Sequence, residues 1–332
     1  MRRLLVLFLA ALVAAGAWVY RDFQHFADAP LQADAPLVLD IALGTPLPGI
    51  VHDLQARGMR TGPDLYWRLL ARRMGVAGKL HAGEYAIAAG TTPHALLAIL
   101  AKGAVVQHRF TIVDGWTFAQ LRQALGRAED LTQTLSAQSD ADIMRALGAG
   151  GAPPEGWFLP ETYQFVKGMS DADILRRAHK AMRATLDKLW AARAPDLPLA
   201  TPYQALILAS IVEKETGSAD ERPLIAAVFE HRLKLGMKLQ TDPTVIFGMG
   251  AAYAGNIRKQ DLEADTPYNT YTRTGLPPTP IALPGAASLE AVLHPAATRA
   301  LYFVARGDGT HEFSDTLQAH NRAVAKYQLH RR

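Results

Sequence analysis

The stretch LASIVEKET, residues 208–216, carries two glutamates at the end of an almost uninterrupted apolar segment. The apolar run predicts an interior helix over residues 203–216. A helix turns about 100° per residue, so Glu215 falls in the centre of the apolar arc. Glu213 falls on the other side, beside Ser210. The two carboxylates are therefore not expected to face each other.

An apolar surrounding and the negative end of the helix dipole would both raise the pKa of Glu215. A shift of ~2 units costs roughly 2.7 kcal/mol, which a leucine at this position would avoid. General-acid catalysis near neutral pH needs such a raised pKa, so Glu215 is a candidate acid. The alternative is a buried ion pair with Arg222 or Arg232. For Glu213 the simpler interpretation is a salt bridge or helix-end carboxylate, and a supporting role in the site is the alternative.

Further helices are expected on both sides of this segment, at 171–192 and 218–235. Ser218 and Glu221 have the spacing of a capping box at the start of the second, although Pro223 fits that start poorly. Residues 151–165, GAPPEGWFLPETYQF, are rich in Pro, Gly and aromatic residues and predict an ordered loop or short strand.

Residues 37–104 predict the order strand, helix, helix, strand, followed by a further helix before Gly103. The second helix of this order, residues 63–74, is amphipathic, with Leu65, Tyr66, Leu69 and Leu70 expected to face inward. The span therefore reads as a small α+β module. A spacer and a glycan-binding module both remain open interpretations.

The N-terminus predicts a membrane anchor. Two arginines precede an uncharged stretch, residues 4–20, that ends with Trp18 and Tyr20. This length and the interfacial aromatic residues indicate a spanning helix, and the arginines predict a cytoplasmic N-terminus. A cleaved signal peptide with a site near residues 15–17 is the alternative. Residues 25–36 are expected to be a linker.

Composition excludes several classes of protein. The chain has 332 residues, 49% of them hydrophobic, and a formal charge of +4 with scattered basic residues, which argues against a nucleic-acid partner. It has no cysteine, so disulfides and thiolate metal sites are impossible. His294, His311 and His320 lack the spacing of a zinc site. No metal or other cofactor is expected.

Polar and aromatic residues also cluster among Gly and Pro in three later segments, a composition that suits either a carbohydrate groove or structural turns. These segments contain Gln240, Thr241 and Asp242; Tyr268, Asn269, Thr270 and Tyr271; and His311, Phe313, Ser314, Thr316, His320 and Asn321.

The ordered set EGWFLPETY, ASIVEKET, RLKLGMKLQTDPTVIFG, YNTY, GLPPTPI and YFVARGDGTHEFSDTLQAHN resembles the YceG-like family of endolytic murein transglycosylases. The resemblance covers nearly the whole chain, although Glu161 stands where the family commonly has Asp. It implies an α+β protein with an N-terminal transmembrane helix (1–24), a linker (25–36), a LysM-like module (37–104) and a catalytic domain (105–332).

The resemblance also implies the reaction. Cleavage of the β-1,4 bond between N-acetylmuramic acid and N-acetylglucosamine in nascent strands would leave 1,6-anhydro ends and terminate elongation. Glu215 would be acid and then base, so no second carboxylate is expected opposite it. The bulk of the chain would be periplasmic, tethered to the inner membrane beside penicillin-binding proteins. Substrate-binding candidates are Glu155, Glu213, Gln240, Asp242, Asn269 and Tyr271.

Two alternatives remain open from the sequence. A membrane-anchored, non-catalytic glycan-binding protein would keep the anchor and the LysM-like module and treat Glu215 as structural. A muramidase-type hydrolase would instead use water and produce reducing ends.

Overall fold

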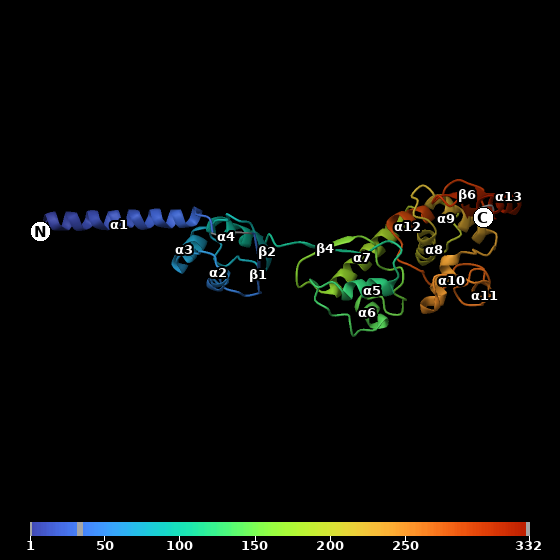
Figure 1. The fold of residues 1–332 in the computed structure, drawn as a ribbon, viewed down its shortest axis with the longest axis horizontal. Helices are drawn as coiled ribbons and strands as arrows, with labels where there is room; N and C mark the ends of the chain where they lie inside the picture. The colour runs from blue at the N-terminus through green and yellow to red at the C-terminus, as the bar shows by residue number, and fades with distance from the viewer. Residues whose placement is uncertain (1, 32–35, 330–332) are drawn as a thin grey trace. The chain divides into compact units, whose positions relative to one another are not determined.

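The computed structural model describes residues 2–31 and 36–329. The chain forms two compact units, one of residues 1–108 and 164–168 and the other of residues 109–163 and 169–332. The fold is mixed α+β, as the sequence predicts, and Figure 1 shows that the strands are few and short among many helices. Within the described residues the strands form three two-stranded sheets, β1–β2, β3–β4 and β5–β6.

The first unit has the expected order strand, helix, helix, strand. Antiparallel β1 and β2 pair Leu37 with Ile87 and Ile41 with Gly83. Thr92 caps the next helix by accepting the Ala95 N–H at 3.1 Å. The elements are α1 (Arg2–Asp28), β1 (Leu37–Ile41), α2 (Leu47–Ala56), α3 (Asp64–Arg73), β2 (Gly83–Ile87) and α4 (Pro93–Lys102).

Two expectations for this unit are wrong. Helix α1 continues to Asp28, so the first residues of the expected linker are helical, and Ala27 and Leu31 are buried in the core of the unit. Residues 32–35 of that linker lie outside the described residues. In α3, Leu65 and Leu69 face outward with 62% and 44% exposure.

The inward side of α3 is formed by other residues. Trp67, Leu70 and Ala71 are buried, and Trp67 donates from Nε1 to the Thr61 carbonyl at 2.6 Å. Burial of the large Trp67 ring determines which side of α3 faces the core. Leu65 and Leu69 lie two residues before and after Trp67, so they fall on the opposite side of a helix with 3.6 residues per turn.

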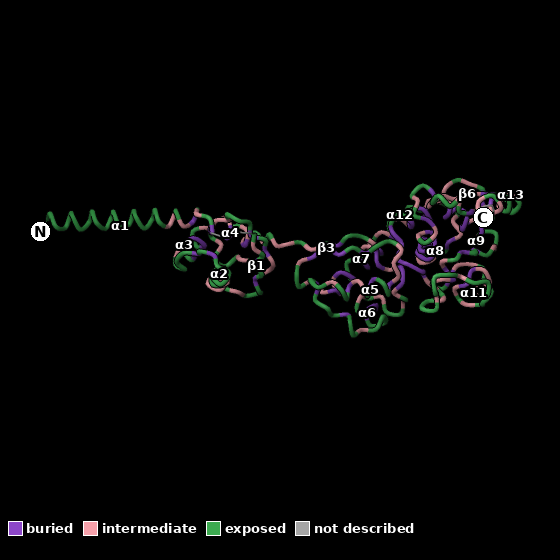
Figure 2. The backbone as a smooth tube through the Cα atoms, viewed as in Figure 1, coloured by how far each residue is buried: buried purple, intermediate pink, exposed green. Residues whose placement is uncertain are grey.

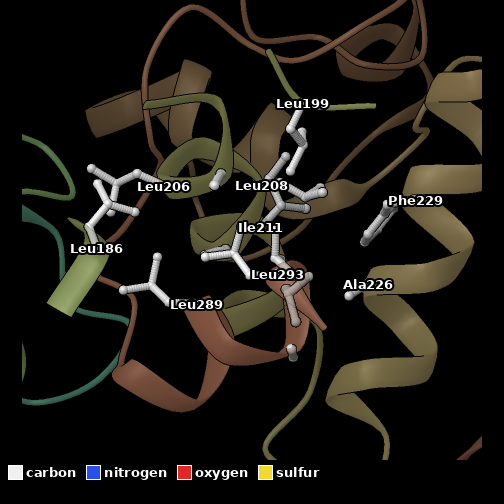
Figure 3. Packing of buried hydrophobic residues seen from close by; sticks show 14 of the residues in the cluster. Leu186, Leu199, Leu206, Leu208, Ile211, Ala226, Phe229, Leu289 and Leu293 are labelled. Atoms are coloured by element: carbon white, nitrogen blue, oxygen red, sulfur yellow. The ribbon is translucent and has the colours of Figure 1, made fainter. Parts of the chain in front are cut away.

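The second unit is built around α8 (Pro202–Glu215), which is buried on every side from Ala205 to Val212. Figure 2 shows the buried backbone concentrated around this helix. In Figure 3, leucines and isoleucine of α8 pack beside Leu289 and Leu293 of α12 (Ala286–Leu293) and near Phe229 of α9 (Arg222–Lys234). This core holds the C-terminal end of α8 in a fixed position.

Other helices and strands complete the described part of the chain. The expected ordered loop at residues 151–165 is confirmed and ends in the short strand β4. The helices and strands not yet named are β3 (His108–Thr111), α5 (Phe118–Gly126), α6 (Asp140–Ala146), β4 (Thr162–Phe165), α7 (Asp171–Ala191), α10 (Asp242–Met249), η1 (Gly250–Ala252), α11 (Lys259–Glu263), β5 (Tyr302–Ala305), β6 (His311–Ser314), α13 (Leu317–Val324) and η2 (Ala325–Leu329).

The expected capping box at residues 218–221 does not form. Helix α9 begins at Arg222, with Pro223 in its first turn, where the absent N–H costs no hydrogen bond. Glu221 has another partner, because its carboxylate accepts the backbone N–H of His311 at 2.8 Å. The tertiary contact has replaced the local one.

Candidate active site

A cavity of about 610 Å³ opens at the C-terminal end of α8. Segments far apart in the sequence line it: the ends of α8 and α9, the turn before α10, strand β5, and one side of the C-terminal helix α13. The polar and aromatic lining residues include Glu215, Arg232, Gln240, Asp242, Tyr271, Tyr302, His311 and Asn321. Three of the residues predicted from the third polar cluster, His311, His320 and Asn321, therefore share a cavity with Glu215.

Glu215 is the last residue of α8, and its carboxylate accepts a hydrogen bond from the Thr241 hydroxyl. Burial is the main cause that raises the pKa of this carboxyl above its usual value, and the nearby charge of Asp242 adds to it. The Thr241 hydrogen bond and the positive charges of His311 and Arg232 act in the opposite direction. The raised pKa that the helix position predicts is therefore present, with burial as its main cause.

The alternative ion pair of Glu215 does not form within the described residues. Arg232 instead donates from Nε to the Leu301 carbonyl at 2.7 Å and from Nη1 to the Leu239 carbonyl at 2.7 Å. Arg222 lies 3.9 Å from a carboxyl oxygen of Glu213. The cavity therefore contains an arginine that stays near Glu215 without direct contact.

The apolar surroundings of α8 do not by themselves distinguish Glu215 from the other residues of the helix. Because α8 is buried all round, Ser210 lies in the interior too, where its hydroxyl donates to the Ile207 carbonyl and accepts the Ile281 N–H. An apolar arc therefore cannot identify the functional side of this helix. Glu215 is distinguished by its position at the end of the buried helix, where the cavity begins.

Glu213 points away from this cavity, in agreement with the predicted divergence of the two carboxylates. Its side chain is 6% exposed. Its Oε2 atom accepts the Gly285 N–H at 3.0 Å and the Ser288 hydroxyl at 2.7 Å. Glu213 thus satisfies donors in the first turn of α12, which is a structural position.

Glu155 also lies outside the lining of this cavity. Both of its carboxyl oxygens accept the backbone N–H of Phe118, at 3.0 and 3.1 Å, at the start of α5. Burial raises its pKa to about 7, although hydrogen bonds from the Phe118 and Gly156 backbones oppose the rise. The arrangement ties the EGWFLPETY segment to α5.

Gln240, Asp242 and Tyr271 all line the cavity. Tyr271 donates from its hydroxyl to Asp242 at 2.6 Å. Gln240 has a positive φ of 52°, an uncommon conformation for a residue other than glycine. Asp242, one of the predicted substrate-binding residues, contributes a second carboxylate to the lining of the same cavity.

Asn269 supports the site from outside the cavity lining. It is 1% exposed, and its Nδ2 donates to the carbonyls of Asp261, Leu262 and Ala264. Its Oδ1 accepts the N–H of Tyr271 at 2.9 Å. Asn269 therefore fixes the backbone that carries Tyr271.

A paired histidine and glutamate were missed as a unit by sequence reasoning. His311 lines the cavity, and its Nδ1 lies 2.7 Å from Oε2 of Glu221. Burial disfavours the Glu221 carboxylate, but the hydrogen bonds and charge of His311 outweigh this and lower the pKa of Glu221. The two residues are 90 positions apart, so no local pattern could have joined them.

The three histidines considered for zinc are not brought together. His311 and His320 line the cavity, whereas His294 makes a hydrogen bond of 2.8 Å with the Ala192 carbonyl. His320 stacks on Tyr302, with ring centroids 5.2 Å apart, and burial lowers its pKa.

Several known proteins are similar to this chain. An endolytic murein transglycosylase of Bacillus subtilis is 40% identical over 176 residues, which cover 53% of this chain and 48% of that protein. The protein of the same name from Streptococcus pneumoniae is 26% identical over 359 residues, covering 97% of this chain and 64% of that protein. The chain thus spans about half to two thirds of the length of these curated relatives.

A solved structure and a family model give the same result. The crystal structure of a yceG-like protein from Listeria monocytogenes matches with a TM-score of 0.52 and 28% identity, covering 87% of this chain and 99% of that one. The model of the YceG-like family matches residues 39–326. This match extends over most of both compact units, so the chain belongs to the YceG-like family.

Proposed function

We propose that this protein is an endolytic lytic transglycosylase of the bacterial cell wall. It cleaves the β-1,4 bond between N-acetylmuramic acid and N-acetylglucosamine inside glycan strands and leaves 1,6-anhydro ends. The observation that carries the proposal is the half-buried Glu215 carboxyl, which opens into the 610 Å³ cavity. The names of the relatives support the same activity.

In the first half of the reaction Glu215 acts as general acid. Because burial raises the pKa of its carboxyl, the protonated form persists closer to neutral pH than that of an ordinary glutamate. The proton passes to the glycosidic oxygen as the bond from that oxygen to C1 of the muramic residue breaks. The positive charge that develops at C1 lies in a cavity that also contains the Asp242 carboxylate.

In the second half the Glu215 carboxylate acts as base. It takes the proton of the muramic 6-hydroxyl while that oxygen bonds to C1 and closes the 1,6-anhydro ring. No water is consumed, and Glu215 regains its proton for the next cycle. The Thr241 hydroxyl, which donates to the carboxylate, holds it in one orientation throughout.

Substrate contacts in this proposal come from the cavity lining. Gln240, Asp242 and Tyr271 provide hydrogen-bonding groups, and Tyr302, stacked with His320, adds an aromatic ring to the wall of the cavity. Glu155, Glu213 and Asn269 act as supports of the site, because their polar atoms are bonded to protein groups. The LysM-like module of residues 37–104 is proposed as a separate glycan-binding element.

The proposed location is the inner membrane, with a cytoplasmic N-terminus and the rest of the chain in the periplasm. Helix α1 is long and apolar enough to span a membrane and is compatible with a single-pass anchor. Arg2 and Arg3 at its start support the orientation. A tether beside penicillin-binding proteins would let the enzyme cut strands as they are made, and its deletion should lengthen glycan strands.

Digestion of purified sacculi tests the proposed reaction. The products should carry 1,6-anhydro ends, each lighter by one water than the reducing end that a hydrolase leaves. Internal fragments should appear early, as an endolytic enzyme requires. Absence of any cleavage would favour a non-catalytic glycan-binding protein.

Asp242 favours a muramidase-type hydrolase as the second candidate. Paired carboxyl groups are the usual equipment of hydrolysing glycosidases, and Asp242 shares the cavity with Glu215. Against this, the Asp242 carboxylate is already engaged by the Tyr271 hydroxyl. Reducing ends in the wild-type digest, abolished by Asp242→Asn, would establish the hydrolase instead.

A further inference from the structure

Helix α3 has an outward face that is exposed among the described residues. Leu65, Arg68, Leu69 and Arg72 are all exposed and lie at the spacing i, i+3, i+4 and i+7. That spacing places them in one stripe along the helix. The stripe thus combines two exposed leucines with two arginines, which is the composition of a basic amphipathic face.

Contacts between α3 and α1 fix the position of this stripe along the axis of the anchor helix. Tyr66 donates from its hydroxyl to Asp22 at 2.8 Å, and its ring meets that of Phe23 with centroids 5.6 Å apart. Asp22 and Arg21 are the first charged residues after the uncharged stretch 4–20. In Figure 1, α3 lies beside the C-terminal end of α1. The start of α3 is therefore held where the apolar span ends.

The C-terminal end of α1 packs into the core of the first unit and so fixes the position of α3 along the anchor. The side chains of α1 are exposed up to Asp22, whereas Phe26 contacts the rings of Tyr66 and Trp67 at 5.4 and 5.5 Å. Leu31 is buried, and its N–H donates to the Thr91 carbonyl at 2.8 Å. The anchor helix thus enters the core of the unit, so α3 cannot move away from the end of the span.

The length of the span brings α3 closer to the lipid. Seventeen uncharged residues rise about 25 Å, less than the ~30 Å of a typical hydrocarbon core. A short span is accommodated by local thinning of the bilayer and by flanking residues that snorkel to the interface, so the residues just beyond the span lie near the headgroups. Basic amphipathic helices at this depth place apolar side chains at the acyl boundary and arginines at phosphate groups.

We propose that Leu65, Arg68, Leu69 and Arg72 form an interfacial face that rests on the phospholipid bilayer spanned by α1. The leucines enter the boundary between headgroups and acyl chains. The arginines pair with the phosphates of anionic lipids. This inference rests on the membrane anchor and is independent of the reaction catalysed by the second unit.

The absence of cysteine from the chain allows a direct test with single labels. Leu69→Cys in the full chain is labelled with a nitroxide and reconstituted into vesicles of phosphatidylcholine with one quarter phosphatidylglycerol. Collision rates with oxygen and with a water-soluble nickel chelate are then measured. Leu235→Cys, at a site in the second unit that is 63% exposed, is the matched control. Flotation with the vesicles verifies the anchor separately.

The interfacial face predicts an oxygen-to-nickel collision ratio at least about threefold higher at position 69 than at position 235. Reversal of both arginine charges, Arg68→Glu with Arg72→Glu, should bring the ratio at position 69 down to that of the control. Equal ratios in the floated, unreversed chain would overturn the proposal. Shielding of position 69 from both reagents would also overturn it, because that result indicates a protein partner. A ratio unaffected by charge reversal would overturn the assignment of the arginines.

Discussion

The two sides of the last turn of α8 present carboxylates in opposite situations. Glu213 accepts the Gly285 N–H and the Ser288 hydroxyl, and its side chain is 6% exposed. Glu215, two residues later, accepts one hydrogen bond, from Thr241, and lines an open cavity. Hydrogen-bond satisfaction and access to the cavity, more than burial, therefore separate a structural carboxylate from one available for chemistry.

Other buried carboxyl groups of the second unit strengthen this comparison. Burial raises the pKa of Glu155 to about 7 and that of Glu230 to about 8, yet neither lines the cavity. A raised pKa therefore does not identify a catalytic acid by itself. In Glu215 it coincides with a place for substrate.

The largest effect is expected on the cavity side. Glu215→Gln keeps the shape of the side chain but removes the transferable proton, so release of anhydro products should fall at least ~100-fold. The matched variant Glu213→Gln should lose much less activity per folded molecule. Rates on sacculi, normalised to the folded fraction by circular dichroism, measure both. Equal losses of activity in the two variants would contradict the assignment of Glu215 to catalysis and Glu213 to structure.

The next largest effect concerns a buried carboxyl away from the cavity. Oε1 of Glu230 has no hydrogen-bond partner within the described residues, and the side chain is 1% exposed. Burial raises the pKa of Glu230 from 4.5 to about 8 on folding. The folded state therefore favours the protonated carboxyl, and the contribution of this group to the free energy of unfolding, complete below pH 4.5, is lost as the pH rises towards 8. The loss is on the order of 4 kcal/mol.

Glu230→Gln removes this ionisation and should flatten that part of the pH dependence. Urea unfolding at pH 5 and pH 8, with the wild type in parallel, measures the difference. The variant should be more stable than the wild type at pH 8, with little loss of activity. If the wild type had the same free energy of unfolding at both pH values, ionisation of Glu230 would not destabilise the fold and the prediction would be wrong.

On the structural side of α8, Glu213→Ala should act on stability. The change leaves the Gly285 N–H and the Ser288 hydroxyl without their acceptor, which costs about 2 kcal/mol. Urea unfolding followed by tryptophan fluorescence measures this loss. If stability is unchanged while activity disappears, Glu213 belongs to the chemistry and the two sides are not distinct.

The smallest effect is a shift in pH dependence. The charge of Asp242 raises the pKa of Glu215, so Asp242→Asn should lower it and move the alkaline limb of the activity profile to lower pH. Tyr271→Phe, which removes the hydroxyl bonded to Asp242, is a useful companion because it keeps the charge. An alkaline limb at the same pH in Asp242→Asn would show that Glu215 does not set it.

Much of the fold could be predicted because its signals are local. Apolar periodicity and caps identified α7 and α8 and the strand, helix, helix, strand order of the first unit. The same periodicity failed for α3, where Trp67 takes the inward position and Leu65 and Leu69 face out. A helical pattern gives the spacing of apolar residues but not which surface they meet.

The site was harder to predict because its pairs are distant in sequence. Glu215 was singled out by its helix position and by family resemblance. The Glu221–His311 pair joins residues 90 positions apart, and the local spacing of Ser218 and Glu221 suggested a cap that does not form. Asn269 was expected at the substrate but braces the backbone of Tyr271.

Direct titration of the Glu215 carboxyl tests most clearly whether this residue can serve as the acid. Infrared difference spectra between the wild type and Glu215→Gln isolate its protonated C=O band from those of Glu155 and Glu230. We predict that the band persists at pH values above 4.5, the ordinary value of a glutamate, because burial raises the pKa of this carboxyl. A band that disappears around pH 4.5 would contradict the assignment of Glu215 as the acid.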